Sequence, residues 1–243
     1  MKAGDQIEGA ALTARDFPDR DLADIVLTGC LIEDAQLSAL KAPGARFVRC
    51  RILRSRFSHA DLREAAFEDC QLFDPEAKAG AAFAFTDLQQ ARFTRCDLAL
   101  ASFEGSGLYA AEFDDCNLMG AAFPRADFSR SFRRSLVRTA AAFRGCNLGL
   151  ADLSGARLPG CDLNRSLFRE ADLSGADLEG ADLRHADLFQ AALDGARLAG
   201  ADLRGAEISG LNLLTLATRE GMKITADQQY ALLSAMGVDV EAG

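Results

Sequence analysis

A period of five residues runs through most of this chain and constrains its fold more than any other feature. Each pentad has a large apolar residue at its centre and a small residue, usually Ala, Cys or Ser, two positions earlier. The other three positions are mainly polar. A short fixed repeat buries a core only by stacking on itself, so a solenoid is expected. The strictest copies read Ala-Asp-Leu and begin at Ala151, Ala171, Ala176, Ala181, Ala186 and Ala201.

The period matches neither an α-helix nor a flat strand, whose side chains repeat every 3.6 and 2.0 residues. It suits a chain that turns a corner every five residues, so that four sides close a square coil of about 20 residues. About 38 pentads then give nine to ten coils, and a rod roughly 45 Å long at about 4.8 Å per coil. An all-β quadrilateral solenoid is therefore predicted.

Cysteine and phenylalanine measure the coil length independently. Successive members of one Cys series and one Phe series are separated by 20 residues, with shared exceptions of 26 and 30. Each series is expected to form one column along the rod, with the Cys in the small inward position. The series are Cys30, Cys50, Cys70, Cys96, Cys116, Cys146 and Phe47, Phe67, Phe93, Phe113, Phe143.

The two longer intervals locate two insertions, near residues 73–82 and 129–142. The first contains Pro75 and Gly80, which are typical of a surface excursion. In the second, an uninterrupted frame would bury the guanidinium groups of Arg133 and Arg138, at a high desolvation cost. We therefore expect residues 131–140 to project as a loop.

The second loop carries candidate contact residues for a partner. Its sequence combines a basic character with apolar residues that have no place in the core. The alternative is a loop that folds back over its own coil. The candidates are Phe132, Arg133, Arg134, Leu136 and Arg138, together with the apolar Val137.

No pattern of catalytic or metal-binding residues is found. His59 and His185 both fall on outward positions far apart in the stack, and no two Cys have the spacing of a zinc site. The Asp before each centre is expected to bind local backbone at a repeating turn. We expect neither an enzyme nor a cofactor or metal, and we interpret the Cys as small buried hydrophobes.

Composition limits the compartment and the partners. Residues 1–10 lack the apolar segment of a signal peptide, and no apolar run is long enough to span a membrane, so a cytoplasmic protein with reduced thiols is expected. The formal charge of −9 and the pI near 4.8 argue against direct binding of nucleic acid.

The repeat pattern stops after Leu213. We divide the chain into a leader (1–9), a repeat domain (10–215) and a terminal segment (216–243). Thr225-Ala-Asp-Gln228 has the form of a capping box that opens a short helix, which Gly237 would end. Val238-Asp-Val240 alternates like a short strand. This segment is expected to cap the open end of the solenoid.

In these pentads the chain resembles the pentapeptide-repeat family, whose fold is a right-handed quadrilateral β-helix. The two loops, the second one longer, and the tail from Gln228 to Val240 further resemble the Qnr and MfpA branch, which protects type II topoisomerases. That resemblance implies a homodimer joined through the C-terminal segment. The residues expected at the dimer contact are Tyr230, Leu233, Met236, Val238 and Val240.

The resemblance also implies DNA mimicry on DNA gyrase and protection from quinolones or related poisons. A duplex about 45 Å long carries about 26 phosphate charges, against −9 here, so the mimicry would be dilute. The alternative is a rigid protein-interaction scaffold with another partner. The acidic surface is expected in the C-terminal half, at Asp172, Asp177, Asp182 and Asp187.

Overall fold

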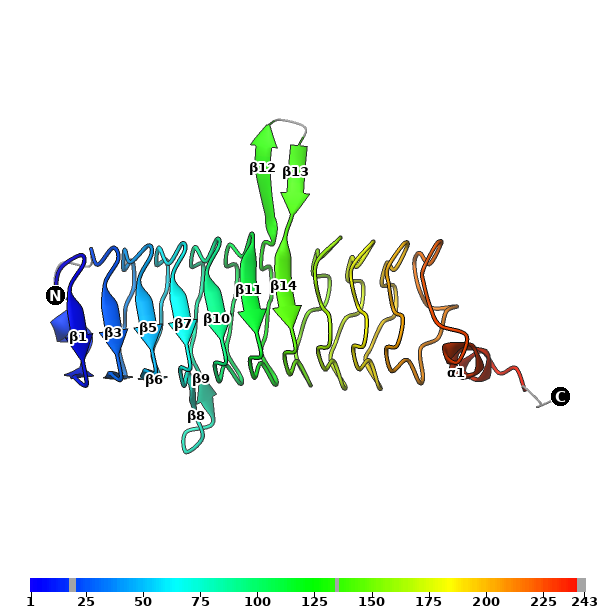
Figure 1. Cartoon of the computed structure of the whole chain (residues 1–243), viewed down its shortest axis with the longest axis horizontal. Coiled ribbons are helices and arrows are strands. Elements are labelled where there is room, and N and C mark those ends of the chain that lie inside the picture. Colours follow the sequence, from blue (N-terminus) through cyan, green and yellow to red (C-terminus); the bar gives the residue numbers. More distant parts are fainter. Residues whose placement is uncertain (18–20, 134–135, 240–243) are drawn as a thin grey trace.

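The computed structural model describes residues 1–17, 21–133 and 136–239, and it is a square rod of stacked coils (Figure 1). One side, which we call face 1, carries a continuous parallel sheet in which each strand pairs with the strand one coil away. The prediction of a right-handed quadrilateral β-helix is confirmed. The strands of face 1 are β1 (Gln6–Glu8), β3 (Val26–Thr28), β5 (Arg46–Val48), β7 (Ala66–Glu68), β10 (Arg92–Thr94), β11 (Ala111–Asp114) and β14 (Ala141–Arg144).

The other three sides follow in chain order. Face 2 begins with the parallel strands β2 (Ala11–Leu12), β4 (Leu31–Glu33) and β6 (Arg51–Leu53). On faces 3 and 4, successive coils are linked by isolated parallel bridges, such as Gln36 to Arg56 on face 3 and Lys41 to Asp61 on face 4. A short 3-10 turn, η1 (Ala14–Asp16), lies within the first coil.

Pairing along face 1 extends beyond the sheet. It continues as single bridges that link Ala142, Asp162, Asp182, Asp202 and Lys223 in turn. We call each chain segment paired on this face a rung. The seven strands and the four residues that follow Ala142 together give eleven rungs. Backbone pairing therefore runs from Gln6 to Lys223, past the ends of the visible repeat on both sides.

Two stacked columns of phenylalanine fill the middle of the rod. Phe93 lies 4.7 Å from Phe67 and 4.9 Å from Phe113 between ring centroids, and the rings are nearly parallel. The neighbouring column of Phe57, Phe83, Phe103 and Phe123 meets the first edge-on. The predicted register across both insertions is confirmed, because rings 26 and 30 residues apart stack as closely as rings 20 apart.

The six cysteines also form the predicted single column. From Cys50 onward, each thiol donates to the carbonyl of a core residue in the preceding coil, as Cys116 does to Phe93 at 3.3 Å. Ser166 continues the column one coil further and donates to Phe143 at 2.8 Å. Cys161 lies outside the column, and burial raises its thiol pKa to about 11. All seven Cys are buried and free, so they act as small packing groups.

The corners explain the polar residues of the pentad. At a typical corner the Ala65 N–H donates to the Leu62 carbonyl at 3.1 Å, which places Glu64 at a φ of 61°. The Asp before the centre accepts a hydrogen bond from the backbone two residues later, as Asp172 does from Ser174 at 2.9 Å. The prediction that these Asp serve the local backbone is confirmed.

Candidate interaction surfaces

The two insertions form hairpins that leave the rod in opposite directions (Figure 1). The short hairpin pairs β8 (Phe73–Asp74) with β9 (Ala79–Gly80) and leaves the corner after face 2. The longer hairpin pairs β12 (Ser129–Arg133) with β13 (Leu136–Thr139) and leaves the corner before face 1. The predicted positions of both insertions are confirmed, and the alternative of a second loop folded over its own coil is wrong.

The long hairpin is fixed to the coil at its foot. Ala140 donates to Phe128 at 3.1 Å and accepts from Ala110 at 2.6 Å. The Asp127 carboxylate receives hydrogen bonds from both the backbone and the hydroxyl of Ser129, at 2.9 and 2.7 Å. The guanidinium of Arg130 lies 6.0 Å from the ring centre of Tyr109. The base of the hairpin is therefore continuous with the rigid rod.

Most of the contact residues predicted on this hairpin lie toward its tip. Arg138 is exposed in β13 and pairs across the hairpin with Arg130. Phe132 and Arg133 belong to β12 and Leu136 belongs to β13. Their side chains, and all of Arg134, lie outside the part of the chain that the structure describes.

An open hollow of about 220 Å³ lies beside the foot of the long hairpin. Its wall is made of small residues, including Ala140 and Gly160, and the polar groups of Glu112, Arg144 and Asp162 lie at its edge. Among the described residues, no group of three or more His, Cys, Asp or Glu is arranged to hold a metal ion.

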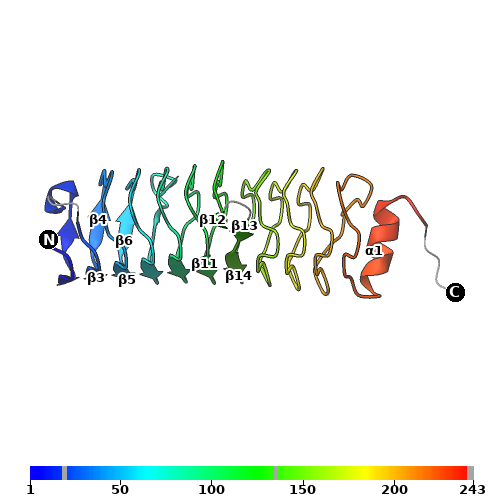
Figure 2. The ribbon, with the colours of Figure 1, turned by 90° about the horizontal axis from the view of Figure 1, so that it is seen from above.

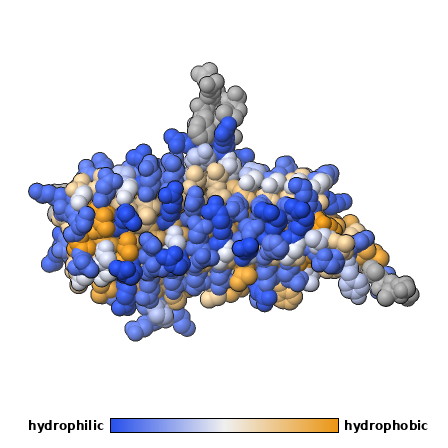
Figure 3. All heavy atoms as spheres, in the orientation of Figure 1, coloured by the Kyte–Doolittle hydropathy of each residue, from blue (hydrophilic) through white to orange (hydrophobic). Residues whose placement is uncertain are grey.

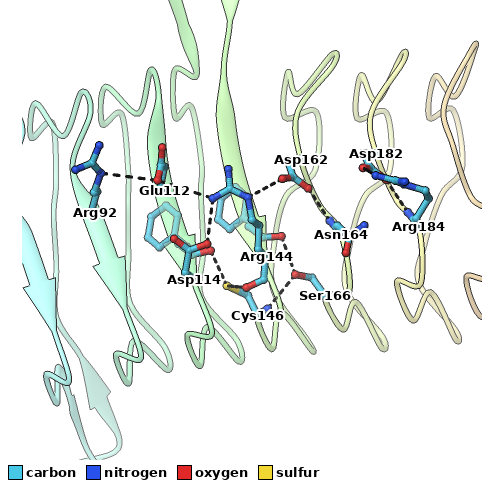
Figure 4. A network of polar contacts seen from close by, with 12 residues as sticks. Arg92, Glu112, Asp114, Arg144, Cys146, Asp162, Asn164, Ser166, Asp182 and Arg184 are labelled. Atoms are coloured by element: carbon cyan, nitrogen blue, oxygen red, sulfur yellow. Dashed lines mark hydrogen bonds and ion pairs between the residues drawn. The ribbon is translucent and has the colours of Figure 1, made fainter.

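Arg144 is the centre of an ion-pair network on face 1 (Figure 4). It contacts Asp162 at 2.6 Å, Asp114 at 3.1 Å and Glu112 at 3.8 Å, and Arg92 approaches Glu112 from the other side at 3.8 Å. The hydrogen bond with Asp162 is the main reason that the guanidinium pKa is raised. Acidic and basic groups on this face thus neutralise each other.

The four predicted acidic contact residues are not brought together. Five residues advance the chain by one side of the square, so Asp172, Asp177, Asp182 and Asp187 lie on faces 3, 4, 1 and 2 in turn. The last three also lie near cations: Asp182 is 2.6 Å from Arg184, Asp187 is 2.5 Å from Arg169, and Asp177 is 3.9 Å from Arg197. These four residues therefore do not form one acidic patch.

The acidic columns that do exist are spaced by twenty residues. Asp162, Asp182 and Asp202 bridge in succession on face 1, and Asp152 bridges to Asp172 on face 3. In the face 1 column, a hydrogen bond with Arg204 lowers the pKa of Asp202 to about 2. A count by twenties along the sequence would have found these columns.

The C-terminal segment closes the end of the rod. Helix α1 (Gln228–Ala235) lies across that end (Figure 2), and its buried Leu232 packs on the core. The Gln228 side chain donates to two coil carbonyls, those of Leu203 at 2.8 Å and Ala206 at 2.7 Å. The predicted cap is thus joined to the last coil by both apolar and polar contacts.

Local details of the cap differ from the prediction. Gln228 accepts a hydrogen bond from the Thr225 N–H at 2.7 Å, as a capping box requires, but the Thr225 hydroxyl donates to the same Gln228 oxygen instead of accepting from the backbone. Gly237 ends the helix with a φ of 78°, as expected. Val238 and Asp239 form no strand, because no neighbouring edge pairs with them in the single chain. Val240 lies outside the described residues.

The predicted dimer residues on this cap are unequally exposed. Tyr230 is 61% exposed, Val238 45% and Met236 37%, whereas Leu233 is half-buried. Leu214, in the last coil, is 64% exposed. Apolar side chains therefore remain in contact with solvent at the C-terminal end of the single chain.

Sequence reasoning missed the anchor of the short hairpin. Asp74 is 4% exposed and accepts hydrogen bonds from the backbone of Glu76 at 2.9 Å and Ala77 at 3.1 Å. Arg54 contacts the same carboxylate and also binds Asp34 at 2.8 Å. The interval of twenty residues from Asp34 to Arg54 and from Arg54 to Asp74 is the signal that could have shown this pairing.

The fold and these repeats define the chain as a member of the pentapeptide-repeat family. The family model for pentapeptide repeats matches residues 30–69, 79–109, 146–184 and 181–213, which is more than half of the chain. Among the described residues, no helix has the length and apolar character needed to cross a membrane.

Among solved structures, the chain is similar to QnrB1, a plasmid-mediated fluoroquinolone resistance protein. A trypsin-treated single-substitution form of QnrB1 is 26% identical, with a TM-score of 0.74 over 100% of both chains. Full-length QnrB1 is 25% identical, with a TM-score of 0.63 over 98% of this chain and 99% of that chain. No sequence among curated proteins matches significantly.

Proposed function

We propose that this protein binds a type II topoisomerase, DNA gyrase, and protects it from fluoroquinolones. The observation that carries the proposal is the similarity to QnrB1 over the full length of both chains. Two projecting hairpins and a C-terminal cap with exposed apolar side chains are consistent with a protein that acts by contact. The role is non-catalytic and needs no cofactor.

In this proposal the rod and the hairpins have different tasks. Eleven rungs at about 4.8 Å give a rod about 48 Å long, which is a rigid spacer comparable in length to a short DNA duplex. The long hairpin supplies the specific grip, because its foot is tied to the rod and its strands extend from it. Two copies joined through the C-terminal cap would present two such hairpins.

In this proposal, charge affects the rate of association with gyrase more than the rate of dissociation. The whole chain carries a formal net charge of −9, but many carboxylates of the rod are already paired with Arg on the same face. Attraction between exposed charges is screened over about 8 Å at physiological salt. Association with gyrase should therefore slow as salt rises, whereas dissociation should depend mainly on hairpin contacts.

The test is a supercoiling assay with purified gyrase and ciprofloxacin, with and without the intact protein. The expected result is that the protein restores supercoiling at drug concentrations that otherwise inhibit it. A variant lacking residues 131–140 is the matched control, because the deletion restores the twenty-residue interval between Cys116 and Cys146. It should fold and protect far less. Failure of the intact protein to protect gyrase would overturn the proposal.

The second candidate is a rigid protein-interaction scaffold for another partner. The ion-pair network around Arg144 favours it, because a face that neutralises its own charge is a poor mimic of a DNA backbone. The same assay separates the two candidates, since a scaffold for another partner would leave gyrase inhibition by the drug unchanged.

A further inference from the structure

Face 2 carries a row of exposed apolar side chains that the core does not need. The five consecutive coils centred on Leu98, Leu118, Leu148, Phe168 and Leu188 each contribute one large apolar residue to the surface, four in the corner turn that follows face 2 and one, Leu167, on the face itself. Their exposed fractions range from 40% to 59%. The row, which we call the apolar row, consists of Leu100, Met119, Leu150, Leu167 and Phe189.

Chance scatter does not account for the apolar row. In the same part of the rod, the other large apolar residue with comparable exposure is Phe85 on face 3, within the described residues. Neighbouring coils pack against both ends of the row: Leu100 lies over Gly120, where an added Cβ would come within 2.7 Å of it, and Arg169 lies over the Phe189 ring at 5.8 Å. Apolar atoms are visible along the lower edge of Figure 3, where face 2 is seen edge-on.

The polar groups within face 2 are mostly satisfied. Asn117 donates to Asp97 at 2.9 Å, and Asn147 donates to Asn117 at 3.3 Å, so they form a ladder beside the apolar row. Arg169 is the one cation in these five coils of the described face, and it is bound to Asp187 at 2.5 Å. No unpaired cation therefore lies among these coils, whereas unpaired carboxylates do, so burial of the row is less costly against a basic partner that compensates them.

One side of the apolar row is bordered by carboxylates. Glu170 occupies the corner position one coil after Leu150, and Asp152 and Asp172 bridge to each other around that corner on face 3. None of the three lies within ion-pair distance of Arg or Lys in the described chain, unlike Asp182 or Asp202. We call these residues the acidic rim.

We propose that the apolar row and the acidic rim bind a basic amphipathic α-helix of a partner protein. Four coil spacings of about 4.8 Å make the row about 19 Å long, which a helix of about 13 residues covers at 1.5 Å per residue. Its apolar side chains at i, i+3, i+4 and i+7 would lie on the row, and Lys or Arg at one flank would reach the acidic rim. The proposal does not depend on the identity of the partner proposed above.

The probe for this site is a synthetic peptide of about 14 residues with Leu at i, i+3, i+4 and i+7 and Lys elsewhere. Binding of the labelled peptide to the full chain is measured by fluorescence anisotropy. A scrambled peptide of the same composition, which has no apolar face, is the control ligand. The expected result is saturable binding of the amphipathic peptide and much weaker binding of the scrambled one. Equal binding of the two peptides, or none, would overturn the proposal.

Variants then localise the binding. Replacing Met119, Leu150 and Phe189 together by Ser should weaken peptide affinity about tenfold or more, because exposed anchors are lost. The matched control, Phe85→Ser on face 3, should leave the affinity unchanged. The single variant Leu150→Ser, at the most exposed position of the row, keeps the test valid if the triple variant misfolds. Equal affinity of the row variants and the control would contradict the site.

The acidic rim is tested separately. Asp152→Asn with Asp172→Asn preserves the hydrogen bonds from Ser154 and Ser174, and should both weaken binding and reduce its dependence on salt. Asp21→Asn on face 4 is the charge control and should do neither. A second copy of this chain is the other possible occupant of the apolar row, and sedimentation of the protein alone tests it. If substitution of the row lowers the mass of the sedimenting particle, the row binds a second copy and the proposal is wrong.

Discussion

Single residues in this rod divide sharply into those that face inward and those that face outward. Phe113 is fully buried and stacks on Phe93 and Phe143 at 4.9 and 4.8 Å, whereas Asp172 points outward and holds a corner turn. Replacing Phe113 by Ala should destabilise the protein by about 3–5 kcal/mol, since a large cavity opens between two rings. Asp172→Asn should cost little, because the amide oxygen can accept the same hydrogen bond. Urea unfolding measures both, and equal losses would show that the inward and outward assignment is wrong.

Paired surface carboxylates give the fold a pH dependence with a defined direction. Hydrogen bonds from Arg63, Arg184 and Arg204 lower the pKa values of Asp61, Asp182 and Asp202, the last to about 2. A lowered folded-state pKa means that the unfolded chain binds more protons below about pH 4, so this stability is present above about pH 4 and is lost as pH falls toward 2.

The expected outcome is an unfolding temperature that changes little between about pH 7 and 5 and falls between about pH 4 and 2. Thermal unfolding followed by circular dichroism measures it. The variant Asp202→Asn should show a smaller fall over the acid range, because it no longer has a carboxylate to protonate at that position. A steeper fall for the variant would contradict the assignment.

At the scale of elements, the sequence predicts the coil better than what is attached to it. The twenty-residue intervals predicted which Phe and Cys stack, because a repeated coil converts sequence distance directly into vertical position. The same rule places the four Asp predicted as partner contacts on four different faces, because residues five apart lie on successive sides of the square. The Arg54 contact with Asp74 was not predicted, since Asp74 turns inward only when β8 and β9 pair.

That contact makes the short hairpin a testable element. Arg54→Ala should leave the nearly buried Asp74 carboxylate without its cation and should loosen β8 and β9, while the Phe columns remain stacked. Lys78, an exposed residue in the turn, offers a trypsin site that reports this loosening. Faster cleavage after Lys78 is expected in the variant, with Arg63→Ala as the control. Unchanged cleavage would show that the backbone alone holds the hairpin.

At the scale of the whole molecule, a solenoid must deal with two open ends. The C-terminal end is covered by α1, whose Gln228 binds the carbonyls of Leu203 and Ala206, yet the outer side of this cap keeps Tyr230 and Val238 exposed. Covering the coil uses Gln228 and Leu232, whereas the predicted contact with a second copy uses Tyr230 and Val238, so variants can separate the two. Removing residues 225–243 would affect both, and the truncated coil should be monomeric or soluble only as aggregates.

A double variant, Tyr230→Ser with Val238→Ser, tests the predicted contact with a second copy separately from the covering of the coil. Neither side chain supports the single chain, so the unfolding temperature should stay close to that of the wild type, while sedimentation should show a monomer where the wild type is expected to be a dimer. Gln228→Ala is the converse control: it leaves two buried carbonyls without a donor and should lower stability. If the double variant sediments as an unchanged dimer, the two copies are joined at another surface, and the apolar row on face 2 becomes the first place to look.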